Sequence, residues 1–272
     1  MSRLREGLGR TALITGASAG IGMALARVFA RGGFNLVLTA RRAERLVALA
    51  DELRATHGIA VRPMPADLAR PDACANLVGA LERLGLGIDA LVNNAGYGVP
   101  GLYRETPWEV QRDFLQVLVT APCELTHRLL PGMTRGGYGR ILNVASVAGL
   151  MPGSASHTLY GGAKAMLIKF SQSLHSEQRG TGVFVSALCP GFTVSEFHDV
   201  NGTRAGMSRL PRFMWLSSEQ VAEEGYRAVM KNEALCIPGA QYKLISTFVR
   251  LLPMNRAHRL GEARTRLIGK RR

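Results

Sequence analysis

The sequence predicts an α/β fold in which a doubly wound, Rossmann-like parallel β-sheet carries helices on both faces. Short runs rich in Leu, Val and Ile alternate with segments of helical period, an order typical of repeated βα units. A glycine-rich turn joins the first of these runs to the first helix. No linker, internal repeat or low-complexity tract divides the 272 residues, so we expect one domain over residues 1–272.

Each expected element follows from its own pattern. Strands are predicted for residues 11–15, 35–39, 60–64, 90–93, 140–144, 183–188 and 235–238, where β-branched residues or leucines precede a turn signal. Helices are predicted for residues 20–31, 43–56, 71–83, 106–133, 159–179 and 217–231, with Ser217 or Ser218 as the N-cap of the last. Residues 242–252 also show helical spacing, and we expect this helix to pack on the core.

Composition narrows the class of protein. A hydrophobic content of 47% suits a folded globule, and the formal net charge is +14. Half of that excess lies in a basic tail, residues 250–272, with eight Lys or Arg against Glu262. Charge alone does not predict nucleic-acid binding, and contact of this tail with a membrane surface is a less favoured alternative. The sequence shows neither a secretory signal nor an apolar run long enough for a membrane span, which favours the cytoplasm.

The four cysteines predict no chemistry of their own. Cys74, Cys123, Cys189 and Cys236 are far apart in the chain and have no histidine at zinc-ligand spacing. We expect free thiols in a reducing compartment and no metal site.

The turn after the first strand fits a dinucleotide. It runs from Thr15 to Gly22 with glycines at Gly16, Gly20 and Gly22, and it opens directly into a helix. A pyrophosphate needs a tight turn, a backbone without Cβ atoms and the free N–H groups of a helix N-terminus. After the second strand, Arg41 and Arg42 stand where an acid would bind a free ribose hydroxyl. Arginine suits a 2′-phosphate, so NADP(H) is preferred over NAD(H).

A serine, a tyrosine and a lysine are predicted to converge at the carboxyl edge of the sheet. Tyr160 and Lys164 are four residues apart on one helix face, and Ser146 follows the preceding strand. Open parallel sheets bind ligands at this edge.

In these motifs the chain resembles the short-chain dehydrogenase/reductase family over nearly its whole length. The matching residues are Thr15-Gly16-x-x-x-Gly20-Ile21-Gly22, Asn93-Asn94-Ala95-Gly96, Ser146, Tyr160-x-x-x-Lys164 and Pro190-Gly191-x-x-x-Ser195. The resemblance implies reversible hydride transfer between a nicotinamide and a ketone or secondary alcohol. Tyr160 would be the general acid/base, Lys164 would hold the nicotinamide ribose and favour the phenolate, and Ser146 would bind the substrate oxygen. A phenol with an ordinary pKa near 10 would need that pKa lowered to act near neutrality.

The resemblance also implies a set of residues that contact the cofactor. Besides Tyr160 and Lys164, these are Thr15, Gly16, Ser18, Ala19, Gly20, Ile21, Gly22, Arg41, Arg42, Asp67, Leu68, Asn93, Ala95, Gly96, Pro190, Gly191, Thr193 and Ser195. Asn93, Ala95 and Gly96 would line the adenosine side, Asp67 and Leu68 would reach the adenine, and residues 190–195 would hold the carboxamide.

Two departures from the family pattern affect the site. Leu118 stands where the family usually has an asparagine that completes a proton relay. Because Pro122 has no N–H, the carbonyl of Leu118 loses its helical partner, and we expect this carbonyl to continue the relay through a water. The interval from Ser146 to Tyr160 is one residue long for the family, which makes Ser154 and Ser156 rivals of Ser146; His157 is expected at the pocket edge.

Substrate and assembly follow from apolar residues. Residues 196–216 form an irregular stretch too apolar for a solvated loop, and we expect a lid over a pocket for a hydrophobic carbonyl or alcohol. Helices 106–133 and 159–179 are apolar around much of their surface, which favours a homodimer or homotetramer. The alternative to an NADP-dependent carbonyl reductase is an NADP(H)-binding regulator with impaired catalysis, or a membrane-surface protein.

Overall fold

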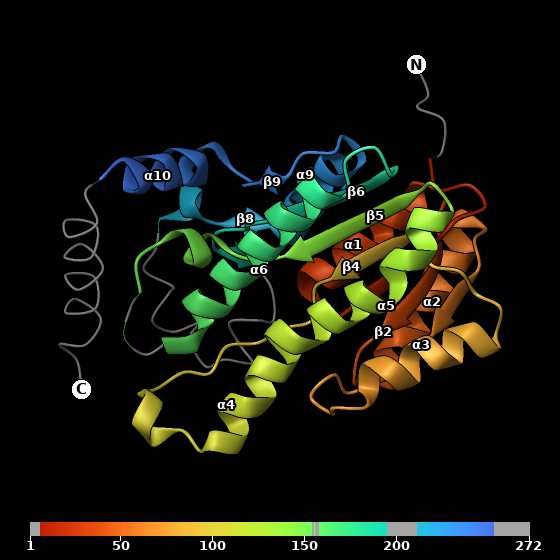
Figure 1. Cartoon of the computed structure of the whole chain (residues 1–272), viewed down its shortest axis with the longest axis horizontal. Coiled ribbons are helices and arrows are strands. Elements are labelled where there is room, and N and C mark those ends of the chain that lie inside the picture. Colours follow the sequence, from red (N-terminus) through yellow and green to blue (C-terminus); the bar gives the residue numbers. More distant parts are fainter. Residues whose placement is uncertain (1–5, 154, 156–157, 195–210, 253–272) are drawn as a thin grey trace.

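A seven-stranded parallel sheet forms the centre of the protein, confirming the predicted fold class (Figure 1). The computed structural model describes residues 6–153, 155, 158–194 and 211–252. The strands lie in the order β3-β2-β1-β4-β5-β6-β9. The order reverses between β1 and β4, and in such sheets the crevice at the reversal is where ligands bind.

The strands of this sheet are short and almost entirely buried. They are β1 (Thr11–Thr15), β2 (Asn35–Thr39), β3 (Val61–Pro63), β4 (Ala90–Asn93), β5 (Gly139–Val144), β6 (Val183–Leu188) and β9 (Leu235–Cys236). Side chains alternate along each strand, so Ile14 packs into one core cluster and Leu13 into the other. Two short strands, β7 (Thr193–Val194) and β8 (Leu216–Ser217), form a separate parallel pair.

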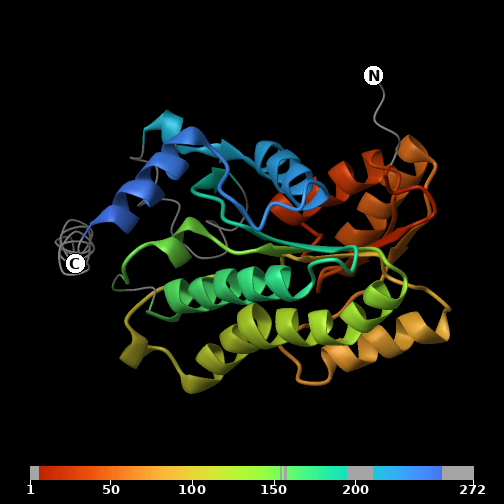
Figure 2. The same ribbon diagram turned by 45° about the horizontal axis from the view of Figure 1, so that its top comes forward.

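Helices cover both faces of the sheet, as Figure 2 shows. One layer contains α1 (Gly20–Arg31), α2 (Ala43–His57) and α9 (Ser218–Met230), and the other contains α3 (Ala73–Arg83), α4 (Trp108–Leu115), α5 (Ala121–Arg135) and α6 (Thr158–Glu177). The last described helix, α10 (Ala240–Leu251), lies at one end of the molecule. Short 3-10 turns are η1 (Tyr103–Glu105), η3 (Val147–Leu150) and η4 (Arg212–Met214). The hydroxyl of Ser217 caps α9 by accepting from the N–H of Gln220 at 3.0 Å.

The helix expected over residues 106–133 is present over residues 108–135, but it is interrupted by a π-helical turn. The chain forms α4, then a π-helical turn η2 (Gln116–Thr120), then α5. Pro122 has no N–H to continue the regular ladder, and the bonding shifts by one residue, with the N–H of Ala121 donating to the carbonyl of Gln116.

Smaller differences lie at the ends of elements. The strand expected at 60–64 is limited to Val61–Pro63, and the strand expected at 235–238 is limited to Leu235–Cys236. Pro63 ends the first strand and Pro238 follows shortly after the second, and proline has no N–H to donate to a neighbouring strand. The helix expected from residue 71 begins at Ala73.

Parts of several expectations lie outside the described residues. These parts are residues 195–210 of the proposed lid, Ser154, Ser156 and His157 of the loop before α6, and the basic tail beyond residue 252. Within the described chain, no helix is both long and apolar enough to cross a bilayer.

Candidate active site

The glycine-rich turn before α1 depends on glycine for its backbone conformation and its packing. Gly16 and Gly20 have φ values of +66° and +52°, a region that side chains disfavour. A Cβ on Gly22 would lie 2.2 Å from the carbonyl oxygen of Gly16, so the helix packs against the turn only because Gly22 lacks one. No side chain caps the first turn of α1, and no acidic residue occupies it. Free N–H groups at a helix N-terminus suit a phosphate.

The turn is held in place by two side chains that span the sheet reversal. The hydroxyl of Thr15 donates to the carbonyl of Val92 at 3.2 Å and accepts from the N–H groups of Asn94 and Ala95 at 2.9 and 3.0 Å. The amide of Asn94 donates to the carbonyls of Thr15 and Gly16 at 2.9 and 3.2 Å. Asn94 was not among the predicted site residues, although the Asn-Asn-Ala-Gly motif contains it.

Two arginines follow β2 beside this turn. The guanidinium of Arg42 donates to the Ser18 hydroxyl from Nε at 3.3 Å and from Nη2 at 3.1 Å. Arg41 is exposed and lies close enough to Tyr97 to oppose the burial that raises the pKa of that phenol. Positive charge therefore flanks the glycine-rich turn at the end of β2.

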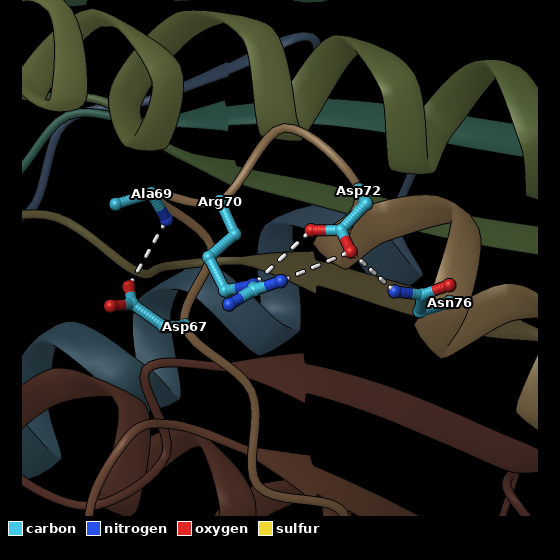
Figure 3. Close-up of polar contacts among 5 residues, drawn as sticks. All are labelled: Asp67, Ala69, Arg70, Asp72 and Asn76. Carbon is cyan, nitrogen blue, oxygen red and sulfur yellow. Dashed lines mark hydrogen bonds and ion pairs between the residues drawn. The ribbon is translucent and has the colours of Figure 1, made fainter.

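The loop after β3 is fixed by its own polar contacts, shown in Figure 3. Asp67 accepts a hydrogen bond from the N–H of Ala69 at 3.1 Å, and Arg70 pairs with Asp72. The exposed carboxylate of Asp67 is thereby held in one orientation. Leu68 is buried in the core beside α3, so its side chain is turned away from this surface.

Asn93 has a different environment from the one expected. Its side chain is buried and donates to Asn143 at 2.8 Å, to the Thr126 hydroxyl at 3.2 Å and to the carbonyl of Pro122 at 3.4 Å. These contacts tie β4 to β5 and α5. The Asn93 side chain therefore lies in the interior, not on the expected adenosine side.

Ser146, Tyr160 and Lys164 meet at the carboxyl end of β5. The Tyr160 hydroxyl forms a hydrogen bond with Ser146. Ser146 Oγ accepts from the N–H of Ala148 at 3.1 Å, which holds the serine at the start of η3. The Lys164 ammonium lies 5.8 Å from the centre of the Tyr160 ring and donates to the carbonyl of Val144 at 2.8 Å.

The protein alone does not lower the pKa of Tyr160. Burial raises it to about 12, and the hydrogen bond from Ser146 opposes the rise. Burial lowers the pKa of Lys164 from 10.5 to about 8, with Cys189 acting in the opposite direction. The expected depression of the phenol pKa therefore does not come from the residues around it, and a bound cofactor would have to supply it.

Leu118 lies in the π-helical turn, directly behind the lysine. Its side chain is buried, and a Cβ placed on Gly96 would be 3.6 Å from Leu118 and 3.8 Å from Lys164 Nζ. Gly96 and the apolar side chain of Leu118 therefore both lie close to the buried ammonium. The amide that the family usually provides at this position is replaced by a hydrocarbon surface.

The segment after β6 is braced from α10. A Cβ on Gly191 would lie 2.0 Å from the Tyr242 ring, so only glycine allows this ring to pack there. The Tyr242 hydroxyl accepts from the N–H of Phe192 at 2.9 Å and donates to the carbonyl of Met214. Thr193 Oγ1 donates to the carbonyl of Gly191 at 3.1 Å. Tyr242 was not predicted; the glycine at 191 was its one sequence signal.

Aromatic, aliphatic and polar side chains lie next to Tyr160. The Phe114 ring lies 5.7 Å from that of Tyr97 and 6.5 Å from that of Tyr160. A small pocket next to Tyr160 is lined by Val99, Gly101, Tyr103, Gln111, Phe114, Thr158 and Leu159. This pocket therefore combines apolar side chains with the polar side chains of Tyr103, Gln111 and Thr158.

No cluster of metal ligands exists among the described residues. All four cysteines are free, and Cys74, Cys189 and Cys236 are buried.

Comparison with known proteins gives a consistent result. The sequence model of the short chain dehydrogenases matches residues 10–204. An uncharacterised oxidoreductase of Myxococcus xanthus is 38% identical over 192 residues, 71% of this chain and 75% of the relative. A 7beta-hydroxysteroid dehydrogenase of Collinsella aerofaciens is 33% identical over 192 residues, 71% of this chain and 72% of that one.

A solved structure extends the similarity to nearly the whole chain. It is a short-chain dehydrogenase from Sphingobium yanoikuyae in complex with NADPH, with a TM-score of 0.78 and 32% identity, covering 97% of this chain and 96% of that chain.

Proposed function

Because this chain belongs to the short-chain dehydrogenase family, a family of oxidoreductases that use nicotinamide cofactors, we propose that it is an NADP(H)-dependent reductase of hydrophobic ketones, or a dehydrogenase of the corresponding secondary alcohols. One observation carries the proposal: the Tyr160 hydroxyl is hydrogen-bonded to Ser146, and the Lys164 ammonium is held on the Val144 carbonyl beside them. The Ser-Tyr-Lys set thus forms one cluster at the edge of the sheet where a substrate would bind.

The residues present fit a dinucleotide. The glycines let the turn pack closely against α1, and no side chain caps the N-terminus of α1, so its N–H groups could bind a pyrophosphate. Thr15, Ser18, Ala19 and Ile21 belong to this turn or to its helix. In this proposal Asp67, Ala95 and Gly96 would line the adenosine side, and Pro190, Gly191 and Thr193 would hold the carboxamide. Ser195 lies outside the described residues.

The chemistry divides between the cofactor and this chain. A bound nicotinamide supplies or accepts the hydride. In the reductive direction Tyr160 gives its phenolic proton to the substrate oxygen, and Ser146 hydrogen-bonds the same oxygen. Lys164 stabilises the resulting phenolate by its charge. The proton is then replaced through Lys164, and we propose the carbonyl of Leu118 with a water as its route to solvent.

Tyr160→Phe tests the role of the phenol. It is expected to lower kcat for ketone reduction by about a hundredfold or more, while NADPH still binds. Tyr226→Phe is a matched control, since Tyr226 packs on Phe29 in the core cluster formed with α9. Undiminished turnover in Tyr160→Phe would contradict the assignment, and lost NADPH binding with it would point to a structural role. If the chain were a regulator without catalysis, the wild type and Tyr160→Phe would both bind NADPH, and neither would reduce a ketone.

The preference for NADP(H) rests on Arg42, Ser18 and Arg41. Arg42 and Ser18 are hydrogen-bonded to each other. A 2′-phosphate next to them would gain charge-assisted hydrogen bonds that a ribose hydroxyl cannot form. Replacing both arginines by alanine is expected to weaken NADPH binding by about tenfold or more and leave NADH binding nearly unchanged. Fluorescence titration of the two cofactors measures this, and equal losses for both would refute the preference.

The hydrophobic substrate class is supported by the Phe114 ring beside Tyr160 and by Val99 and Leu159 in a pocket lining that also contains polar side chains. The relative from Collinsella aerofaciens bears the name of a steroid dehydrogenase, which fits the same proposal. We expect NADPH oxidation with lipophilic ketones and little with polar sugars; the reverse preference would count against this substrate class. Homo-oligomerisation through the helices of the α5 and α6 layer stays a prediction.

A further inference from the structure

The helix α10 is buried on one face and apolar on the opposite face. Tyr242 and Ser246 pack against the protein and are buried. Leu244, Phe248 and Leu251 follow at spacings of four and three residues, and they are 73%, 60% and 79% exposed. This spacing places the three side chains in one stripe along the helix. We call these three residues the α10 stripe.

A second apolar side chain extends this surface. Phe213 in η4 is 69% exposed, and the side chain of Gln241 donates to its carbonyl at 3.0 Å. This bond holds η4 against the first turn of α10. Both segments lie at the end of the molecule away from most of the sheet, as Figure 1 shows. Large apolar side chains gathered in this way mark an interaction surface.

The charge around the α10 stripe is positive. Lys243 and Arg250 are exposed and lie two helical turns apart on one flank of the stripe. Arg212, the neighbour of Phe213 in η4, is a third exposed basic residue. From residue 250 onward the sequence has eight Lys or Arg and one Glu. A second copy of this chain would bring like charges together at this surface, whereas an anionic surface would complement them.

We propose that the α10 stripe and Phe213 dock on an anionic phospholipid bilayer, with α10 lying in the plane of the interface. A helix with one apolar face and a basic flank is the usual form of such an anchor. The basic residues would contact the lipid headgroups. No helix in the described part of the chain is suited to span the bilayer, so the contact is with its surface.

The docking surface is joined directly to the candidate active site. Tyr242, on the buried face of α10, hydrogen-bonds Phe192 and Met214 on either side of the segment after β6. The same helix contacts η3, which begins just after Ser146. Where the proposed function holds, docking would bring the enzyme to the membrane in which a lipophilic ketone is dissolved.

Vesicle sedimentation of the full-length protein tests the proposal. The probes are vesicles of phosphatidylcholine mixed with phosphatidylglycerol, and vesicles of phosphatidylcholine alone, without substrate or cofactor. The variants are Leu244→Ser/Phe248→Ser/Leu251→Ser and, as a matched control, Leu84→Ser, an exposed leucine at the end of α3. Lys243→Gln/Arg250→Gln tests the charge. Light scattering reports the oligomeric mass of each protein.

We expect the wild type and Leu84→Ser to sediment with the anionic vesicles and to be released by salt. The triple serine variant should bind at least about tenfold more weakly, because three large apolar side chains no longer enter the interface. Each removed charge should weaken binding by about fivefold. Equal binding to neutral vesicles, unchanged binding of the triple variant, or a fall in its oligomeric mass would overturn the proposal. NADPH binding measured on the same samples shows separately whether the proposed function fails.

Discussion

Replacing Lys164 by methionine is expected to stabilise the cofactor-free protein near neutral pH. Lys164 is buried, and its pKa is lowered from 10.5 in the unfolded chain to about 8 in the native state. The unfolded chain therefore binds more protons between these two values, and the native state is penalised below about pH 8. The penalty falls as the pH rises toward 10.5, because the unfolded lysine then loses its proton as well.

The size of the effect follows from the two pKa values. A difference between 10.5 and about 8 corresponds to a cost of about 3 kcal/mol at pH 7. Methionine removes this cost but also removes the hydrogen bond to the Val144 carbonyl, which contributes about 1 kcal/mol. Lys164→Met should therefore be more stable by about 2 kcal/mol at pH 7 and slightly less stable than the wild type above about pH 10.

Urea unfolding of both proteins over this pH range, without cofactor and at one protein concentration, measures the difference. Taking the difference cancels titrations that the two proteins share. The groups beside the lysine should stay neutral in this range, since burial raises the pKa of both Tyr160 and Cys189 to about 12. A methionine variant that is less stable at pH 7, or a difference that does not change with pH, would refute the reasoning.

Two further predictions concern the protonation of Tyr160 and the glycine turn. Because burial raises the pKa of Tyr160 to about 12 in the cofactor-free protein, its phenol should stay protonated up to about pH 10. Titrating tyrosinate absorbance in the cofactor-free wild type and in Tyr160→Phe checks this, and a difference between the two that appears below about pH 9 would contradict it. Gly22→Ala places a Cβ against the Gly16 carbonyl and should cost about 1–3 kcal/mol of stability and weaken NADPH binding. The control is Gly132→Ala, in the middle of α5, where an added Cβ would meet no other atom. Its free energy of unfolding should rise by up to about 1 kcal/mol in the same denaturation assay.

Local patterns predicted the elements and the convergence of Ser146, Tyr160 and Lys164. The four-residue spacing of Tyr160 and Lys164 fixes their shared helix face, and Ser146 follows a strand, so all three meet at one sheet edge. The family follows from motifs of this kind, which the comparisons confirm.

What the sequence did not predict depends on contacts between distant segments. The Asn94 side chain hydrogen-bonds the glycine-rich turn after β1, whereas the Asn93 side chain points into the core. The neighbouring residues in the sequence do not distinguish these two asparagines. The π-helical turn arises because Pro122 disrupts a ladder that the apolar pattern alone would continue. The raised pKa of Tyr160 depends on how much protein surrounds it, which the residue spacing does not report.

The Tyr242 hydroxyl couples the position of α10 to that of the chain after β6. One oxygen atom links α10 to the chain on both sides of the stretch that follows β6. A displacement of α10, from whatever it rests upon, would pull on Phe192 and Met214 together. Whatever binds the outer surface of α10 and moves this helix would therefore also move the chain that follows β6.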